Sequence, residues 1–267
     1  MTVHSGPGVR PAAAAGSFYP ADRARLAATV DALLAAAGSA PAGAGRLTAL
    51  VVPHAGYRYC GQVAAAAYAL VRNRSPARVV LLGPAHFVPL TGSVVPRAGQ
   101  WSTPLGRVSV DPAARDLTLA VPGVYAADEP HAGEHALEVQ LPFLQRTVGA
   151  GVPVLPVATA APPEDVADLL DAVAADPRTL VVASTDLSHY LTDAAARDRD
   201  GRTIEAVLAL RPDLVGAGSA CGVHALRGLL AWAGRRGRTP ALLAYRTSAD
   251  ATGDPRRVVG YAAVAFR

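Results

Sequence analysis

The stretch LTALVVPH, residues 47–54, decides the fold class, because a short apolar and β-branched run ends there directly in a histidine. The same pattern recurs in RVVLLGPAH, residues 78–86, and in TLVVASTDLSH, residues 179–189. Strands that are apolar on both of their faces are typical of parallel sheets covered by helices on two sides. These stretches therefore predict buried strands at Leu47–Pro53, Arg78–Gly83 and Thr179–Ser184, with polar residues placed where each strand ends.

Outward from these stretches, short apolar runs alternate with longer segments rich in Ala and Leu. Further strands are predicted at Val152–Ala158, Pro240–Tyr245 and Val258–Phe266, and helices at Ala21–Ala37, Gly61–Val71, Glu134–Val148, Pro163–Ala174, Thr192–Leu210 and Gly222–Ala233. The segment Gly92–Asp111, which is rich in Pro and Gly, is expected to form an irregular or hairpin excursion. Because strands alternate with helices and no linker divides the chain, we expect one α/β domain over residues 1–267. Its expected architecture is a three-layer α/β/α sandwich with a largely parallel or mixed central sheet.

Composition excludes several classes of protein. The chain is 51% hydrophobic and 17% charged, which is incompatible with global disorder. It has a net charge of +4, but all 25 basic residues are Arg and no aromatic residues alternate with them, so we expect no nucleic-acid partner. No apolar run approaches the roughly 20 residues of a membrane span. Two cysteines cannot form a disulfide framework, and without a secretory pattern we expect a cytoplasmic location.

Polar side chains follow four of the predicted strands. They are His54, His86, the pair Asp186 and His189, and Asp250. In open α/β sheets the ligand crevice lies beyond the carboxyl ends of the strands, so we expect these side chains to share one pocket. Two imidazoles and one carboxylate are the ligand set of non-haem Fe(II) sites, and the same set also serves zinc with a bound water. The alternative for each histidine alone is that it satisfies a loop carbonyl at the end of a strand.

A second polar cluster runs from His131 to His135 and has the spacing H-x-x-E-H. In inverted zinc peptidases that spacing places two histidines one turn apart and supplies Glu134 as the base. Pro130 and Gly133 disfavour the continuous helix that this geometry needs. The alternatives are a first helical turn with Glu134 near the positive end of the dipole, or a set of residues that supports the strand-end site.

The two cysteines each precede or open a predicted helix. A thiol at a helix N-terminus has a lowered pKa, so Cys60 and Cys221 are candidates for reactivity, with plain packing as the alternative. No dinucleotide fingerprint, phosphate loop or nucleophile elbow is present in the sequence.

Several of these motifs together resemble one known family. They are PAAAAGSFYP at 11–20, PHAGYRYCG at 53–61, GPAH at 83–86, TPLGRV at 103–108, EHALEVQLPFL at 134–144, STDLSHY at 184–190, ACG at 220–222, YRTSADATGD at 245–254 and VGYAAVAF at 259–266. In this order they resemble the Memo family, whose bacterial members are often called AmmeMemoRadiSam system protein B. The resemblance spans nearly the whole chain.

The resemblance implies a fold similar to the class III extradiol ring-cleaving dioxygenases, with a metal-site cleft. It implies that His54 and His86 are metal ligands and that Asp186 and His189 are a catalytic pair in the cleft. In the vertebrate relatives a Cys after a Ser-rich C-terminal motif is the third ligand. Here residues 248–251 read SADA, with no Cys, which favours Asp250 as an oxygen ligand over a thiolate site.

The leading expectation is therefore a dioxygenase-like redox enzyme that uses Fe(II), with zinc or copper as alternatives. His189 would act as acid or base, and Asp186 would orient it or join the ligand set. Glu134, His135 and Cys221 would support the site from outside the ligand set. The alternatives are a peptide- or protein-binding adaptor that uses the same cleft, and a metal-dependent hydrolase. The bacterial family name also implies association with an AMMECR1-like protein and a radical SAM protein.

Overall fold

The computed structural model of the protein describes residues 8–38, 45–72 and 74–267. Its main sheet contains β2 (Ala49–Val52), β3 (Arg78–Gly83), β4 (Ser93–Val95), β7 (Val124–Ala126), β8 (Val154–Thr159), β9 (Thr179–Ser184), β10 (His189–Leu191), β11 (Pro240–Thr247) and β12 (Val258–Phe266). Their order is β10-β12-β2-β9-β3-β8-β4-β7, and β11 pairs with the same strand, β12, that β10 pairs with.

The sheet is parallel at its centre and antiparallel on its flanks. The neighbours β2, β9, β3 and β8 run parallel to one another. On one side β12 is antiparallel to β2, and β11 is antiparallel to β12. On the other side β4 is antiparallel to β8. The central strands are buried along almost their whole length, as their apolar sequence predicts.

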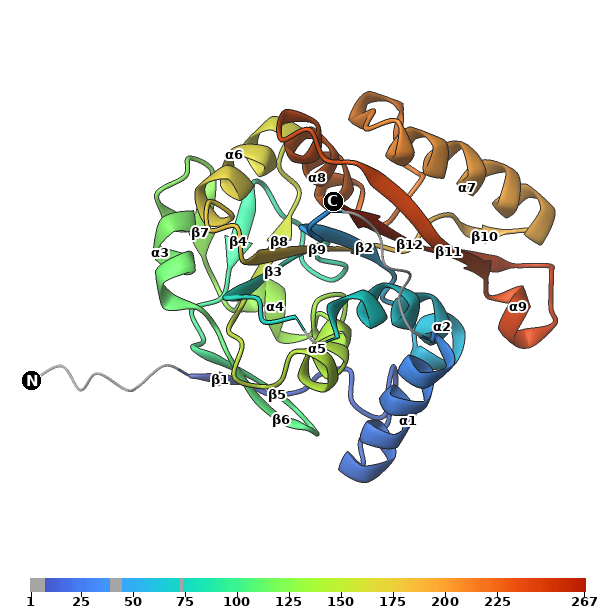
Figure 1. The fold of residues 1–267 in the computed structure, drawn as a ribbon, viewed down its shortest axis with the longest axis horizontal. Helices are drawn as coiled ribbons and strands as arrows, with labels where there is room; N and C mark the ends of the chain where they lie inside the picture. Colours follow the sequence, from blue (N-terminus) through green and yellow to red (C-terminus); the bar gives the residue numbers. More distant parts are fainter. Residues whose placement is uncertain (1–7, 39–44, 73) are drawn as a thin grey trace, which may run out of the picture.

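Helices cover both faces of the sheet, so the predicted three-layer architecture is confirmed (Figure 1). One face carries α1 (Arg23–Ala36), α2 (Tyr57–Tyr68) and α5 (Leu141–Thr147), and the other carries α3 (Pro112–Leu119), α6 (Pro163–Val173), α7 (Asp193–Leu208) and α8 (Val223–Arg235). Shorter pieces are α4 (Glu129–Ala132), α9 (Ala249–Thr252), η1 (Ala69–Val71), η2 (Glu138–Gln140) and η3 (Pro212–Leu214). Among the described residues every helix is too short or too polar to cross a membrane.

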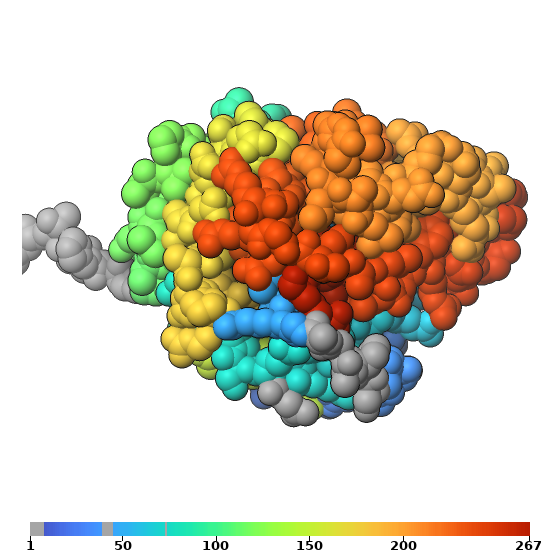
Figure 2. Space-filling view, turned by 45° about the horizontal axis from the view of Figure 1, so that its top comes forward, coloured from blue at the N-terminus to red at the C-terminus, as the bar shows by residue number. Residues whose placement is uncertain are grey.

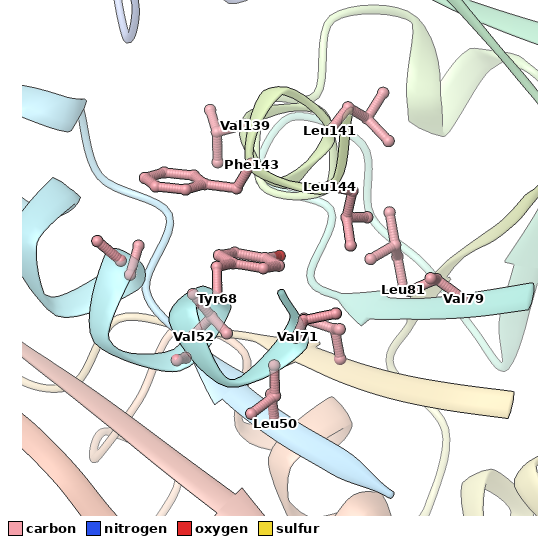
Figure 3. Close-up of a cluster of buried hydrophobic side chains, with 14 of the residues drawn as sticks. Leu50, Val52, Tyr68, Val71, Val79, Leu81, Val139, Leu141, Phe143 and Leu144 are labelled. Carbon is pink, nitrogen blue, oxygen red and sulfur yellow. The ribbon is translucent and has the colours of Figure 1, made fainter. Parts of the chain in front are cut away.

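The core under α2 and α5 is built around two stacked aromatic rings (Figure 3). The ring centroids of Tyr68 and Phe143 lie 5.1 Å apart with an interplanar angle of 8°. The alanines of α2 let this helix approach the sheet closely, so Tyr68 is completely buried and its hydroxyl donates to Gln140 Oε1 at 2.9 Å. A buried tyrosine hydroxyl of this kind needs such a partner.

Two further segments, 92–111 and 134–148, differ in how well they match their predicted structure. The excursion at 92–111 contains the hairpin of β5 (Gln100–Thr103) and β6 (Gly106–Ser109), which β1 (Val9–Arg10) extends to three strands. The predicted helix Glu134–Val148 is wrong over its first half, where only the short turn η2 forms, and the α-helix begins with α5. The cause is local: the Glu134 carboxylate accepts the backbone N–H groups of His135 and Ala136 and so holds this segment in a turn.

Candidate metal centre

Three adjacent strands of the sheet deliver the central residues of the site. His54 follows β2, Asp186 follows β9 and His86 follows β3, and these strands are neighbours in the sheet. Cys221 joins them from the loop before α8, where its N–H donates to the Asp186 carbonyl at 3.2 Å. One ligand atom each from His54, His86 and Cys221 lies within 4.8 Å of the other two. The predicted convergence of the strand ends is therefore present for the two histidines.

The orientation of His54 follows from its hydrogen bonds. Ser184 Oγ donates its one proton to the Ala136 carbonyl at 2.7 Å, so it can only accept from His54 Nδ1, which lies 2.9 Å away. The same Oγ also accepts from Gln140 Nε2 at 2.9 Å. His54 Nδ1 therefore carries the proton, and the Nε2 lone pair faces Cys221 Sγ at 3.1 Å. This is the tautomer that a metal ligand requires.

Glu134 fixes His86 in the corresponding way. Its Oε1 lies 3.0 Å from His86 Nδ1, and its Oε2 accepts the His86 backbone N–H. Burial lowers the pKa of His86, but hydrogen bonds to Cys221 and Glu134 outweigh it and raise this pKa to about 9. Burial raises the pKa of Glu134, but its hydrogen bonds, first those from His86 and the Ala136 N–H, lower it to about 2. A carboxylate that is ionised in this way is a strong acceptor for the Nδ1 proton of a histidine ligand.

A second group of possible ligands consists of His86, Glu134 and His135. One ligand atom from each of them lies within 4.8 Å of the other two. The Glu134 carboxylate is already occupied by three backbone N–H groups and His86 Nδ1, so it orients this segment and is poorly placed to bind an ion itself. The His135 ring stacks on Phe18, with centroids 4.2 Å apart, and on His86 at 4.8 Å. Burial and the nearby His54 lower the pKa of His135 to about 4, so its ring is neutral at neutral pH.

Of the expected catalytic pair, Asp186 adjoins the cluster, and both residues lie outside the two donor groups. Asp186 is buried, and its Oδ1 accepts the backbone N–H of His54 at 2.8 Å. His189 is half-buried, and its Nδ1 lies 2.8 Å from the Leu187 carbonyl. A carbonyl can only accept, so Nδ1 carries the proton and the His189 Nε2 lone pair is free to act as a base.

The structure does not bring Asp250 to the histidines. Strand β12 lies between β2 and β11, so the residues after β11 are displaced sideways from His54. The Asp250 carboxylate accepts the Thr247 N–H at 2.7 Å and pairs with Arg197 at 3.1 Å. The third donor atom beside the two histidines is the Cys221 thiol, so the structure favours a sulfur ligand over the oxygen ligand expected at Asp250.

The H-x-x-E-H spacing does not form a peptidase site. Helix α4 ends at Ala132, before His135, so the two histidines do not share a helical face. His131 points away into the core, where its ring meets Trp101 edge-on with centroids 5.5 Å apart. Glu134 and His135 both contact His86, which agrees with the alternative that this segment supports the strand-end site.

An ion pair that the sequence analysis missed anchors the site from behind. Arg10 bonds Glu138 at 2.5 Å, and both side chains are buried. Arg10 Nη2 also donates to the Glu134 carbonyl at 2.6 Å, while Glu138 accepts from Tyr19 and from the backbone of the 11–20 motif. Gln140, which holds Ser184, was missed as well. The sequence does contain a signal for both residues, because Glu138 and Gln140 are polar positions inside the otherwise apolar run 137–144.

The comparisons with known proteins identify the family of the chain. The family model described as Memo-like protein matches residues 10–265. A MEMO1 family protein of Methanopyrus kandleri is 36% identical over 97% of this chain and 99% of its own. A MEMO1 family protein of Ignicoccus hospitalis is 37% identical over 97% of this chain and 98% of its own. A MEMO1 family protein of Aquifex aeolicus is 34% identical over 97% of this chain and 99% of its own.

One solved structure shares the fold. The crystal structure of an uncharacterized protein of Escherichia coli K12 aligns with a TM-score of 0.56 at 16% sequence identity, over 82% of this chain and 99% of that one. At this identity the likeness speaks for the fold alone. The sequence comparisons go further, and they show that the chain belongs to the Memo family.

Proposed function

We propose that the protein is a metal-dependent oxidoreductase, dioxygenase-like, whose ion is held by His54, His86 and Cys221. The single observation that supports this most is the cluster itself, three donors within 4.8 Å whose two imidazoles are both turned by Nδ1 partners so that Nε2 faces inward. Imidazole and thiolate together suit iron, copper and zinc. We propose iron, with copper and zinc as the ions to compare.

The residues around the cluster have separable roles in this proposal. A bound redox-active ion would supply the electron transfer between oxygen and an organic substrate. Ser184 and Glu134 hold the two imidazoles in place, so little reorganisation is needed on binding. His189 Nε2 takes a proton from the substrate, and the Leu187 carbonyl keeps its Nδ1 protonated throughout. The exposed ring of Phe87, 6.1 Å from that of His135, gives the mouth of the site an apolar wall.

Oxygen uptake by iron-loaded protein with a panel of catechols and other phenols tests the activity. We expect uptake by the wild type, a loss of about 10²–10⁴-fold in His189→Gln, and no change in the half-buried control His224→Gln on α8. Uptake that is absent throughout the panel, or that His189→Gln leaves intact, would contradict the proposed role of this cleft.

A peptide-binding role is the second candidate, favoured by one cavity. A cavity of about 710 Å³ is bordered by Phe18, whose ring also packs on His135, and by Tyr59, Arg58 and Arg246. Peptide binding to metal-free protein without turnover would support this role. Association with an AMMECR1-like protein and a radical SAM protein is likewise a proposal, and co-purification of the three tests it.

A further inference from the structure

A separate cavity of about 280 Å³ lies at the edge of the sheet opposite the metal cluster, by which we mean the three donors His54, His86 and Cys221. It is bordered by the residues that precede β2 and β3 and by the beginning of β9. These strands are parallel, so their amino ends meet here while their carboxyl ends carry the histidines. Figure 2 shows this edge, where the azure segment that begins near residue 45, the teal segment before residue 78 and the yellow segment near residue 177 adjoin. The cavity is therefore separate from the cluster of His54, His86 and Cys221.

The floor of this cavity is apolar. Leu47, Val71 and Leu180 contribute to it, and each is more than nine-tenths buried in the protein. The volume is just below the range of about 300–1,000 Å³ that is common for small-molecule sites. An apolar floor of this size can accept a short hydrocarbon group.

The rim of the cavity is positively charged. Arg46, Arg74 and Arg178 border it. Asp176 pairs with Arg178 at 3.0 Å and offsets that charge. Among the described residues no carboxylate pairs with Arg46 or Arg74, and Arg74 uses only its Nε, which donates to the Leu70 carbonyl. Two exposed arginines, whose guanidinium groups are paired with no carboxylate among the described residues, therefore border one apolar cavity.

Thr179 adds an observation of a different kind. This residue is 5% exposed, and its side-chain Oγ1 is buried without a hydrogen-bond partner among the described residues. A buried hydroxyl without a partner is costly, so native structures rarely keep one without a reason. The backbone does not explain the choice of residue, because the strand pairing of Thr179 with Arg78 needs no hydroxyl. Thr179 borders the same cavity as the two arginines, and its hydroxyl is turned away from the open space.

We propose that this cavity binds a small organic oxyanion, a carboxylate or phosphate monoester that carries a short apolar group. The oxyanion accepts from the Arg46 and Arg74 guanidinium groups and, once the Thr179 side chain has rotated about χ1, from its hydroxyl, while the apolar group lies on Leu47, Val71 and Leu180. Guanidinium groups are well suited to carboxylate and phosphate because they present paired donors. Nothing in this inference depends on the metal cluster or its chemistry.

Calorimetric titration of the full chain at low salt with hexyl phosphate, hexanoate and inorganic phosphate tests the proposal. We expect one of the two hexyl probes to bind more tightly than inorganic phosphate, and the comparison between them distinguishes a phosphate ester from a carboxylate. The double variant Arg46→Gln with Arg74→Gln should weaken binding by about tenfold or more. The control Arg202→Gln, an exposed arginine on α7, should bind like the wild type. The absence of binding by all three probes, or an unchanged double variant, would overturn the proposal.

Thr179→Val provides a second test that separates binding from folding. The substitution keeps the shape of the side chain and removes the hydroxyl that has no partner. We expect it to weaken binding of the hexyl probe several-fold and to raise the melting temperature of ligand-free protein. A lower melting temperature with unchanged binding would show that the hydroxyl serves the fold, and would overturn its place in the site.

Discussion

Glu134 holds His86, one of the three donors of the candidate metal centre, by hydrogen bonds and is not itself a proposed ligand. We expect Glu134→Gln to lower the affinity for the ion by about 10–100-fold, because the amide is a weaker acceptor for the Nδ1 proton of His86. The matched control is Glu129→Gln, an exposed carboxylate on α4 close in the sequence. Competition titration with a chromophoric chelator measures both affinities. Equal losses in the two variants would contradict a specific role for Glu134.

His131 makes the stability of the protein sensitive to acid. Burial, and next the charge of Arg10, lower its pKa from 6.5 to about 4. The unfolded chain therefore binds the proton first, so this contribution to stability is present above pH 6.5 and is lost as the pH falls toward 4. Between pH 7 and pH 5 the loss is about 2 kcal/mol.

Urea unfolding at these two pH values checks the role of His131. The variant His131→Phe keeps a ring of similar size but has no proton to bind, so its free energy of unfolding should fall by about 2 kcal/mol less than that of the wild type. The control His224→Gln should show the wild-type pH dependence. Identical pH dependence in His131→Phe and the wild type would contradict the assignment.

The residues of the cluster could be predicted from the sequence only in part. His54 and His86 were found because each directly follows a buried parallel strand, which fixes its place at the edge of the sheet. Asp250 also follows a strand, but no sequence pattern showed that β12 would separate β11 from β2. Cys221 lies before a helix and not after a strand, so its approach to Asp186 depends on tertiary packing that periodicity does not encode.

At the scale of elements, the contact between α6 and α8 depends on one glycine. A Cβ at Gly228 would lie 2.3 Å from Val166 Cβ, whereas a Cβ at Gly234 on the same helix would meet nothing within 4 Å. We expect Gly228→Ala to lower the free energy of unfolding by about 1–3 kcal/mol. Gly234→Ala should raise it by about 0.5 kcal/mol through helix propensity alone. Chemical denaturation of both variants tests this, and a stabilised Gly228→Ala would show that the helices are not in close contact.

Elements whose burial is uniform were the most predictable. The ranges of β3, β9 and β12 agree with the apolar runs that predicted them, because nearly every residue of these strands is buried. The helix predicted from Glu134 was wrong because a single carboxylate captures two backbone N–H groups. Helix propensity cannot anticipate this, since the competing interaction exists only when Glu134 faces His86.

At the scale of the whole molecule, the sheet places two sites at opposite ends of the same strands. Strand β9 begins at Thr179, in the arginine-rimmed cavity, and ends at Ser184, which holds His54. Helices on both faces bury these strands. The N-terminal motif at 11–20 is held by Glu138, whose partner Arg10 donates to the Glu134 carbonyl.

We propose that Cys221, and not Asp250, completes the metal centre with His54 and His86. Metal content by mass spectrometry on protein purified without oxygen tests it most directly, with the wild type beside Cys221→Ser and Asp250→Asn. We predict about one ion per chain in the wild type and in Asp250→Asn, and loss of the ion in Cys221→Ser. An ion that survives Cys221→Ser but is lost in Asp250→Asn would contradict the account.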